Sequence, residues 1–583
     1  MAKPASPQFL ATLGRTIEEG VVLQRQGKLA EAEKIYTRIL KVLPDQFETL
    51  QLLAELKMQR GKPGEAFRHM TAAVAARPGN ADAHIHLGLV LRALKREPDA
   101  LASFDKAMTL DPRNIDALGN RGDLLLALGR PGEALACFDH ILGVSPGHLD
   151  ARANHGAALA ALGRYHEALV DFDLVLAAGP NPIVAYNRGL ALAELGRTAE
   201  AVEAYDRALA MMPNHVGALS SRGVSLQALN RHAEAIASFD RALAIAPDFA
   251  DAHFNKSLAL LAIGDYARGQ VEYEWRWKRS GARPQPRRAF DGPLWLGETP
   301  LGHRTILLHA EQGLGDTVQL ARFVTPLARA GAKVVLEVQP ALKTLLSRLP
   351  GCAAVIGRGE PRPRYDVHCP LGSVPLALDM KPSEIPTEIP YLSADPERVA
   401  RWRPRLAELA APRIAMVWAG HVAHTNDRNR SMALAKLAPL WSTDRARFVS
   451  VQRDLRDGEA ELLAAAPVLH LGSELDDFDD TAAVLALCDL VISVDTSVAN
   501  VAGALGRPLW VLLPFSSDWR WTAHGEPSPW YPAARLFRQP QPRDWDSVVA
   551  RVVEELDQHP EKWMPVFGRD HARGNGQNGV TLP

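Results

Sequence analysis

The chain has 583 residues, which is too many for a single hydrophobic core and predicts about three to five domains. Its 66 basic and 67 acidic residues leave a formal net charge of −1, so we expect no nucleic acid or other strongly charged partner. No apolar run reaches the roughly 18 residues of a membrane span, and the start lacks a signal-peptide core. The four cysteines form no CxxC pair, which favours a reducing, cytoplasmic setting.

The first half of the chain repeats with a fixed period. A proline recurs at steps of 34, 34, 34, 34, 33 and 34 residues, at Pro44, Pro78, Pro112, Pro146, Pro180, Pro213 and Pro247. Twelve residues before each proline stands an alanine, and a large, mostly aromatic residue follows four later, at Tyr36, Met70, Phe104, Phe138, Phe172, Tyr205 and Phe239. Glycines keep the same register at Gly88, Gly122, Gly156, Gly189 and Gly223.

This period is typical of stacked helix pairs. Small residues let two helices approach, the aromatic ring fills the gap, and proline stops the second helix. The pattern resembles the tetratricopeptide repeat. It predicts an α-solenoid of about eight repeats over residues 9–278, with an aromatic cluster at Tyr273, Trp275 and Trp277 that caps it against the second half of the chain.

The second half alternates short β-branched runs with helical stretches. Residues 279–302 are rich in Pro, Gly and Arg and read as a linker with a docking loop. The expected strands are RTILLHA, KVVLEV, AAVIG, YDVHCP, RIAMVWAG, RFVSVQ, PVLHLG, DLVISVD and RPLWVLLP. This order predicts parallel sheets in two Rossmann-like α/β domains, over 303–400 and 413–556, with a cleft between them. The polar, glycine-rich tail over 568–583 is predicted to be disordered.

One candidate site follows the first of these strands, in the segment EQGLGDTVQ. Ligands of α/β sheets bind outside the carboxyl ends of the strands. Gly313 and Gly315 would let backbone amides approach a substrate, and a helix from about Thr317 would favour an anion there. Asp316 is placed to act as a base in the cleft, or it simply caps the helix. His309 and His421, beside the same cleft, are candidates to bind a sugar or phosphate or to act as an alternative base, or they are ordinary strand-end histidines.

A second candidate site is DTSVANVAGALGRP. The strand before it delivers Asp495 and Thr496 to its carboxyl end, and a helix from about Ser497 to Gly506 offers free amides to a diphosphate. Asp495 is suited to sugar hydroxyls, and Thr496 and Ser497 to hydroxyl donation. The alternative is ordinary strand–cap–helix packing. We expect the acidic run at 476–480 to be a loop, with Asp480 capping a helix, rather than a metal site.

Together with VWAGHVAHTNDRNRS and DWRW…SPWYPAARLFRQP, these segments resemble bacterial tetratricopeptide proteins with a heptosyltransferase-like (glycosyltransferase family nine-like) domain. The resemblance covers residues 303–556. It implies a GT-B fold, a metal-independent inverting mechanism, and a nucleotide sugar as co-substrate with no cofactor. Asp316 matches the family's candidate base. The family's D-T-G-x-x-H motif falls on Asp495, Thr496, Ser497 and Asn500, with glycine and histidine replaced.

The family's phosphate-facing lysine has no clear counterpart, and Arg428 or Arg430 is expected to supply that charge, unless both belong to a solvated loop. The order of repeats and transferase also resembles O-linked N-acetylglucosamine transferase. An asparagine recurs two residues before the glycine position, at Asn120, Asn154, Asn187 and Asn255. Such amides suit an extended peptide backbone, or they join adjacent repeats. In the transferase family a similar ladder contacts the substrate peptide.

The sequence therefore predicts a glycosyltransferase that acts on a protein or peptide held by the repeats. A non-catalytic scaffold with a degenerate transferase domain is a second hypothesis. A transferase that acts on lipopolysaccharide or another glycan, with repeats used only for assembly, is a third.

Overall fold

The computed structural model describes residues 7–279, 288–424, 426–442 and 445–558. The predicted tail over 568–583 and part of the predicted linker over 279–302 lie outside these residues. The chain divides into two compact units, an N-terminal unit (Met1–Pro213) and a C-terminal unit (Asn214–Pro583). Within the described ranges, no helix is both long and apolar enough to cross a membrane.

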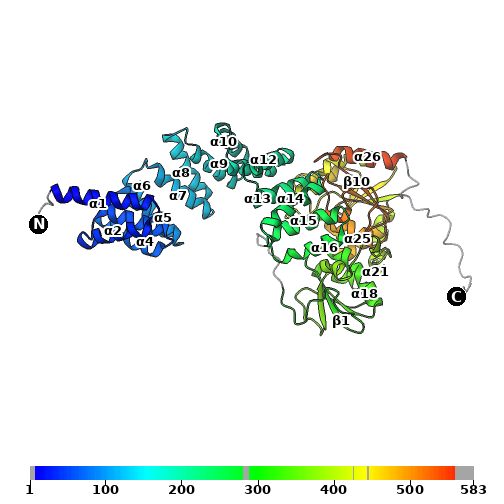
Figure 1. The fold of residues 1–583 in the computed structure, drawn as a ribbon. Helices are drawn as coiled ribbons and strands as arrows, with labels where there is room; N and C mark the ends of the chain where they lie inside the picture. The colour runs from blue at the N-terminus through cyan, green and yellow to red at the C-terminus, as the bar shows by residue number, and fades with distance from the viewer. Residues whose placement is uncertain (1–6, 280–287, 425, 443–444, 559–583) are drawn as a thin grey trace, which may run out of the picture. The chain divides into compact units, whose positions relative to one another are not determined.

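The N-terminal unit consists of helices that pack in consecutive pairs (Figure 1). They are α1 (Pro7–Arg25), α2 (Leu29–Val42), α3 (Phe47–Gln59), α4 (Pro63–Ala76), α5 (Ala81–Ala93), α6 (Glu97–Leu110), α7 (Ile115–Ala127), α8 (Pro131–Val144), α9 (Leu149–Ala161), α10 (Tyr165–Ala178), α11 (Pro182–Glu194) and α12 (Thr198–Met211). The second helix of a pair ends two residues before a repeating proline, as α4 ends at Ala76 before Pro78. Proline, which has no N–H to donate, thus ends the helix where the period predicts.

A glycine of the first helix in a pair meets the large residue of the second. A Cβ on Gly88 would lie 2.5 Å from the ring of Phe104, and one on Gly122 would lie 2.6 Å from Phe138. Real Cβ atoms do not approach that closely, so only glycine fits. Both rings are buried. These contacts confirm the predicted helical repeat fold.

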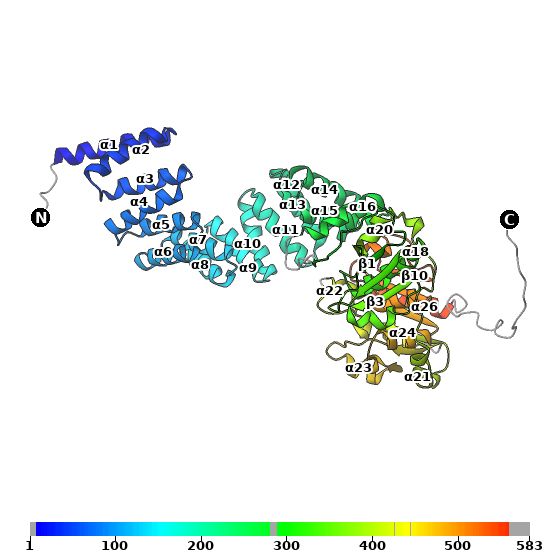
Figure 2. The same cartoon turned by 90° about the horizontal axis from the view of Figure 1, so that it is seen from below.

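Four more repeat helices begin the C-terminal unit, and the last two of them share a buried core with its sheets (Figure 2). They are α13 (Val216–Ala228), α14 (His232–Ile245), α15 (Ala250–Ala262) and α16 (Tyr266–Tyr273), followed by the 3-10 helix η1 (Glu274–Trp277). Gly223 repeats the close contact, 2.5 Å from Phe239. Tyr273 is buried in the core that the repeat end shares with both sheets, whereas Trp275 stacks on His253 at 3.8 Å.

Polar contacts fix the last repeats to the α/β part of the C-terminal unit. Buried Arg276 donates to the hydroxyl of Ser373 at 2.6 Å and pairs with Glu311 at 3.3 Å. Asn230 donates its side-chain amide to the carbonyl of Phe515 at 2.8 Å. The end of the solenoid is therefore built into the α/β core rather than tethered to it.

The first sheet has four parallel strands in the order β3-β2-β1-β4. Its strands are β1 (Thr305–His309), β2 (Lys333–Val338), β3 (Cys352–Gly357) and β4 (Val367–Pro370). Its helices are α17 (Leu314–Leu320), η2 (Ala321–Phe323), α18 (Val324–Arg329), η3 (Pro340–Leu342), α19 (Lys343–Leu346), η4 (Leu371–Ser373), α20 (Val374–Ala377) and η5 (Pro382–Glu384). All four strands match predicted ones.

The second sheet has six parallel strands in the order β10-β9-β8-β5-β6-β7. They are β5 (Arg413–Val417), β6 (Arg447–Ser450), β7 (Val468–His470), β8 (Leu490–Val494), β9 (Leu509–Leu513) and β10 (Ala534–Arg538). Its helices are α21 (Pro396–Ala407), α22 (Asp427–Arg430), η6 (Leu434–Ser442), α23 (Glu459–Ala465), η7 (Gly472–Glu474), α24 (Phe478–Ala486), α25 (Ser497–Ala504), η8 (Trp519–Trp521) and α26 (Trp545–Gln558).

This is the strand order of doubly wound α/β domains, in which the order reverses between β5 and β8 and leaves a crevice at their carboxyl ends. The α/β prediction is therefore confirmed, although β10 was not predicted. One local prediction was wrong: Asp477, not Asp480, caps α24. Asp480 is instead paired with Arg398 at 2.8 Å.

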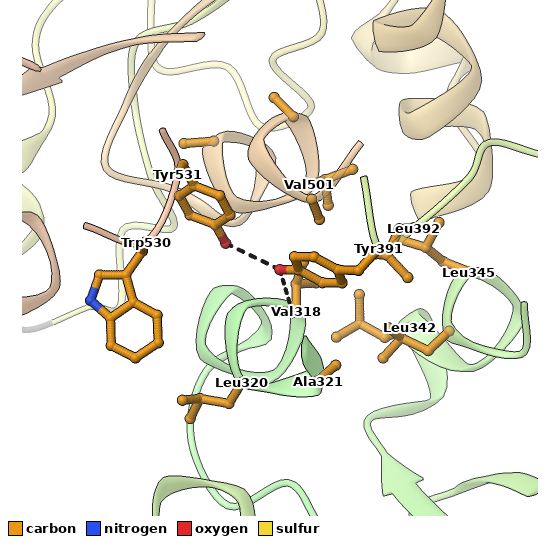
Figure 3. Packing of buried hydrophobic residues seen from close by; sticks show 14 of the residues in the cluster. Val318, Leu320, Ala321, Leu342, Leu345, Tyr391, Leu392, Val501, Trp530 and Tyr531 are labelled. Atoms are coloured by element: carbon orange, nitrogen blue, oxygen red, sulfur yellow. Dashed lines mark hydrogen bonds between the residues drawn. The ribbon is translucent and has the colours of Figure 1, made fainter. Parts of the chain in front are cut away.

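The two sheets are joined through α17 and α25, which pack against each other (Figure 3). The hydroxyl of Tyr391 donates to the carbonyl of Val318 at 3.1 Å and lies 3.4 Å from the hydroxyl of Tyr531. Beside these rings, buried Arg322 donates to the carbonyl of Trp530 at 2.6 Å. The candidate site lies at the other end of this helix pair, where both helices begin.

Candidate functional site

The C-terminal unit contains a cavity of about 1340 Å³ at the carboxyl ends of β1, β5, β6, β8 and β9. The loops after these strands form one side of it. The other side comes from the repeats, with Gln227 on α13, His232 on α14 and Asn255 on α15. The crevice between β5 and β8 opens into this cavity, so the site lies where doubly wound sheets bind ligands.

Helices α17 and α25 begin side by side in the cavity wall. A Cβ on Gly315 would lie 2.8 Å from the side-chain nitrogen of Asn500 and 3.4 Å from the Cα of Ser497. Gly315 therefore permits this close approach. Helix α17 begins at Leu314, not near Thr317 as predicted, and the Asp316 carboxylate holds its start by accepting from the N–H of Gly313 at 3.0 Å.

Asp316 also pairs with an arginine from the second sheet. Arg520, on η8, donates to one Asp316 oxygen at 2.8 Å and to Asp518 at 2.9 Å. The same guanidinium donates to the side-chain oxygen of Gln312 at 3.0 Å and lies over the ring of Trp519, 4.6 Å from its centre. Burial alone would lower the pKa of Arg520, but Asp316 and Asp518 raise it well above its ordinary value.

Asp495 lies at the end of β8, in the same cavity. Burial, and then the charge of Asp518, raise its pKa to about 6, although the indole of Trp521 and the charge of Arg430 act in the other direction. Arg430 donates to the backbone carbonyl of Asp495 at 3.0 Å, and its Nε is buried without a partner. Arg430 therefore presents a positive charge at the β5–β8 crevice.

The remaining residues of the DTS segment differ in what they can contact. Ser497, at the start of α25, lines the cavity. Thr496 also lines it, but its hydroxyl lies 3.0 Å from that of Ser493. Asn500 is buried: it donates to the carbonyl of Thr496 at 3.2 Å and accepts from the hydroxyl of Tyr531 at 2.9 Å. Asn500 thus joins α25 to the junction between the sheets.

The structure separates the other predicted binding residues. His421 lines the cavity with Arg430, whereas Arg428 is exposed and lies outside the lining. His309 is not brought to the cavity either. Its buried ring stacks on Phe290 at 4.2 Å, and its Nε2 lies 3.2 Å from Nδ1 of His368. Burial, with the nearby Arg288, lowers the pKa of His309 to about 2.

The four predicted peptide-binding asparagines have different surroundings. In the N-terminal unit, Asn120 donates to the carbonyl of Asp116 in its own helix at 2.8 Å. Asn154 donates to Asp123 of the adjacent repeat at 2.7 Å, which is the alternative arrangement for this ladder. Asn187 is half-buried on α11. Asn255, in the C-terminal unit, lines the cavity.

Several residues of the cavity were not singled out from the sequence as polar candidates. They are Gln227, His232, Gln312, Asp518 and Arg520. The DWRW segment, which contains Arg520, is part of the family resemblance, but no role was predicted for its arginine. The partner of Arg520, however, lies in a distant segment that no local pattern connects to it.

Comparison with known proteins identifies the repeats. A tetratricopeptide repeat family model matches residues 51–115, 120–181, 155–216, 186–248 and 220–274, and a second one matches 103–136. These matches show that residues 51–274 are tetratricopeptide repeats. The matched part is consistent with the helix pairs and leaves both sheets outside it.

Among curated proteins, the chain is similar to Protein FlbA of Caulobacter vibrioides, with 29% identity over 321 residues. The match covers 50% of this chain and 53% of FlbA, so the chain spans about half the length of this relative. A tetratricopeptide repeat protein from Parabacteroides merdae is 20% identical, with a TM-score of 0.37 over 43% of this chain and 99% of that one. YrrB, a tetratricopeptide repeat protein with an unusual peptide-binding site, is 24% identical, with a TM-score of 0.28 over 32% and 98%.

Proposed function

We propose that the C-terminal unit is a GT-B-type glycosyltransferase, which moves a sugar from a nucleotide sugar to an acceptor. The observation that carries this proposal is the arrangement at the β5–β8 crevice. Arg430, whose Nε is buried without a partner, donates there to the backbone carbonyl of Asp495. Helix α25 begins two residues after Asp495. A guanidinium and a helix start are the groups that bind a diphosphate. The two parallel sheets and the resemblance of residues 303–556 to heptosyltransferases support it.

The proposed mechanism is a single inverting displacement. Asp316 removes the proton of the acceptor hydroxyl as that oxygen attacks the anomeric carbon. The bond from this carbon to the diphosphate breaks, and the leaving diphosphate carries away the electron pair. Arg430 and the amides at the start of α25 stabilise the charge that develops on it. Asp495, which is near the crevice, is suited to hold hydroxyls of the donor.

In this proposal the repeats bind the acceptor. We infer that this acceptor is a protein or peptide. The side of the cavity formed by α13–α15 is mostly apolar, with Gln227, His232 and Asn255 as polar groups. Both ring nitrogens of His232 are buried without a partner, as is the indole N–H of Trp519 in the same lining. Such orphaned groups gain stability when a ligand satisfies them. Amides and a neutral imidazole suit an uncharged backbone.

Thermal unfolding of the full chain with a panel of nucleotide sugars and nucleoside diphosphates tests the donor site. A ligand at 100 times its Kd stabilises the folded state by about 2.7 kcal/mol. We expect one donor class to raise the Tm of the wild type. Arg430→Gln should lose this rise, and Arg428→Gln, a matched control two residues away and outside the cavity, should keep it. If no nucleotide raised the Tm, the transferase proposal would be wrong.

A non-catalytic scaffold is the second candidate, and one observation favours it. Asn500, which replaces the family's histidine, makes contacts within the fold, to Tyr531 and Thr496. A scaffold would bind protein partners through the repeats and leave nucleotide sugars unconsumed. Turnover of a donor therefore separates the two proposals.

A further inference from the structure

Both carboxylate oxygens of Asp316 already accept a hydrogen bond in the arrangement that the structure shows. One accepts the N–H of Gly313 at 3.0 Å, and the other accepts from Arg520 at 2.8 Å. Arg520 therefore competes with the acceptor hydroxyl for that oxygen.

Arg520 is built to exchange partners. Its side chain is 12% exposed, within the cavity lining, and its Nε is buried without a partner. It contacts three groups, Asp316, Asp518 and Gln312, so releasing one of them leaves the others to hold it. A diphosphate in the cavity offers several anionic oxygens that match the fork of a guanidinium better than one carboxylate oxygen does.

We propose that Arg520 is a positioning residue that couples donor binding to the base. Without donor, Arg520 pairs with Asp316 and keeps it from the acceptor. When the donor binds, its diphosphate replaces Asp316 as the partner of Arg520, and the freed carboxylate oxygen accepts the acceptor hydroxyl. Donor must then bind before a reactive acceptor complex forms. This inference rests on the proposed transferase function. It goes beyond that function, because a diphosphate could bind in the cavity without competing with Asp316 for Arg520.

The competition is tested by measuring diphosphate affinity in a double-mutant cycle. The probes are inorganic pyrophosphate and the diphosphates of uridine, guanosine, cytidine and thymidine, titrated by calorimetry into the full chain. Arg520→Gln should weaken the tightest of them by roughly 10-fold or more, and Arg520→Lys should recover much of the loss. Asp316→Asn should tighten it by roughly 10-fold, because Arg520 no longer has to leave a carboxylate.

The double variant separates this coupling from simple charge removal. In an Arg520→Gln background, Asp316→Asn should have almost no effect, because no guanidinium remains to be released. The control is Asp454→Asn, which removes a charge from the cavity lining at a residue for which the structure gives no contact with Arg520, and should change affinity by less than about 3-fold.

The outcomes distinguish the two proposals. If neither the wild type nor any variant bound any of the probes, both the donor site and the coupling would be wrong. If the wild type bound a diphosphate but Arg520→Gln bound it equally well, the coupling alone would be wrong, and Arg520 would only tie the two sheets together. If Asp316→Asn still tightened diphosphate binding in the Arg520→Gln background, the coupling would also be wrong.

Discussion

The helix pairs of the N-terminal unit and helices α13–α16 of the C-terminal unit follow one sequence pattern in two kinds of surroundings. In the N-terminal unit, the buried clusters join neighbouring helices, and each glycine at the repeating position meets the large residue of its own pair. In the C-terminal unit, the same contact recurs between Gly223 and Phe239, but α15 and α16 also share a core with both sheets. The comparison teaches that the repeat pattern fixes a helix pair, whereas its surroundings decide what its polar positions do.

The asparagine position illustrates this difference. Asn154 donates a hydrogen bond to Asp123 of the preceding repeat, and its amide therefore stabilises the solenoid. Asn255, at the same register position, lines a cavity formed by strand ends of both sheets and by the repeat helices α13–α16. If this interpretation is right, substitutions in the two regions should separate effects on stability from effects on the cavity.

The largest stability effect is expected from the junction of the sheets. Arg322 is buried and donates to the carbonyls of Trp530, at 2.6 Å, and Gln319, at 2.9 Å. Arg322→Met leaves these carbonyls without their donor and should lower the free energy of unfolding of the C-terminal unit by about 3 kcal/mol. The exposed Arg329→Met should cost about 0–1 kcal/mol. Denaturant unfolding measures both, and hydrogen exchange should show the N-terminal unit unchanged. Equal losses for the two variants would contradict the assignment.

The next effect concerns two glycines of one helix, α7. Gly122→Ala places a Cβ 2.6 Å from the ring of Phe138 and should destabilise the N-terminal unit by roughly 1–3 kcal/mol. Gly119→Ala meets only Ile141, at 3.9 Å, and should instead stabilise the helix by about 0.5–1 kcal/mol. Opposite signs in thermal unfolding would confirm that close contact, not helix propensity, selects the repeating glycine. The same sign for both would show that it does not.

The pH dependence of stability should differ between the units. The raised pKa of Asp495, about 6, exceeds the value of about 3.9 for an unfolded chain. The folded state therefore holds this proton more tightly, and the stability present below pH ~4 is lost as the pH rises through about 6. Asp495→Asn should remove that loss and gain stability relative to the wild type between these pH values. Thermal unfolding at pH 4.5, 6 and 7.5 checks this, and an unchanged difference across the series would count against it.

His155 provides the counterpart in the N-terminal unit. Its hydrogen bond to Asp171 raises its pKa, more than burial lowers it, and Asp139 adds to the rise. Its stabilising effect is thus complete below the unfolded pKa of about 6.5 and is lost as the pH rises through the higher folded value. Hydrogen exchange of α9 and α10 should become faster across neutral pH, after correction for the intrinsic rate, and His155→Gln should flatten this change. The loss in the C-terminal unit should come at lower pH.

The smallest effect is expected at the asparagines. Asn154→Ala removes the hydrogen bond to Asp123 and should cost about 1 kcal/mol. Asn255→Ala should cost about 0.5 kcal/mol or less, because its role in this account is toward a ligand in the cavity. Denaturant unfolding of both variants compares them directly. A larger loss at Asn255 would place it among the structural residues.

The sequence predicted the elements whose stabilising contacts are local. The glycine, aromatic and proline of a repeat act within one period. The buried strands are indicated by their runs of β-branched residues. Strand β10 was missed because ARLFR is short, carries two arginines and follows a proline-rich stretch. The start of α17 was missed because Gly313 and Gly315 are poor helix formers. The Asp316 carboxylate, which accepts from the N–H of Gly313, holds the first turn in place.

The candidate site was predictable to the extent that strand ends position it. Asp316, Asp495 and Arg430 meet because the carboxyl ends of parallel strands lead to one crevice. His309 was misplaced because successive side chains of a strand point to opposite faces, and its own points to Phe290 and His368. Arg520 could not be predicted, because its role depends on contacts between distant segments.

The most direct test of the central claim is turnover of the nucleotide sugar that raises the Tm. The full chain is incubated with that donor, and release of the nucleoside diphosphate is measured for the wild type and for Asp316→Asn. The account predicts slow release by the wild type, faster when an acceptor is present, and a loss of roughly 100-fold or more in the variant. Turnover that is unaffected by Asp316→Asn would contradict its role as the base, and no turnover of any bound donor would contradict the transferase itself.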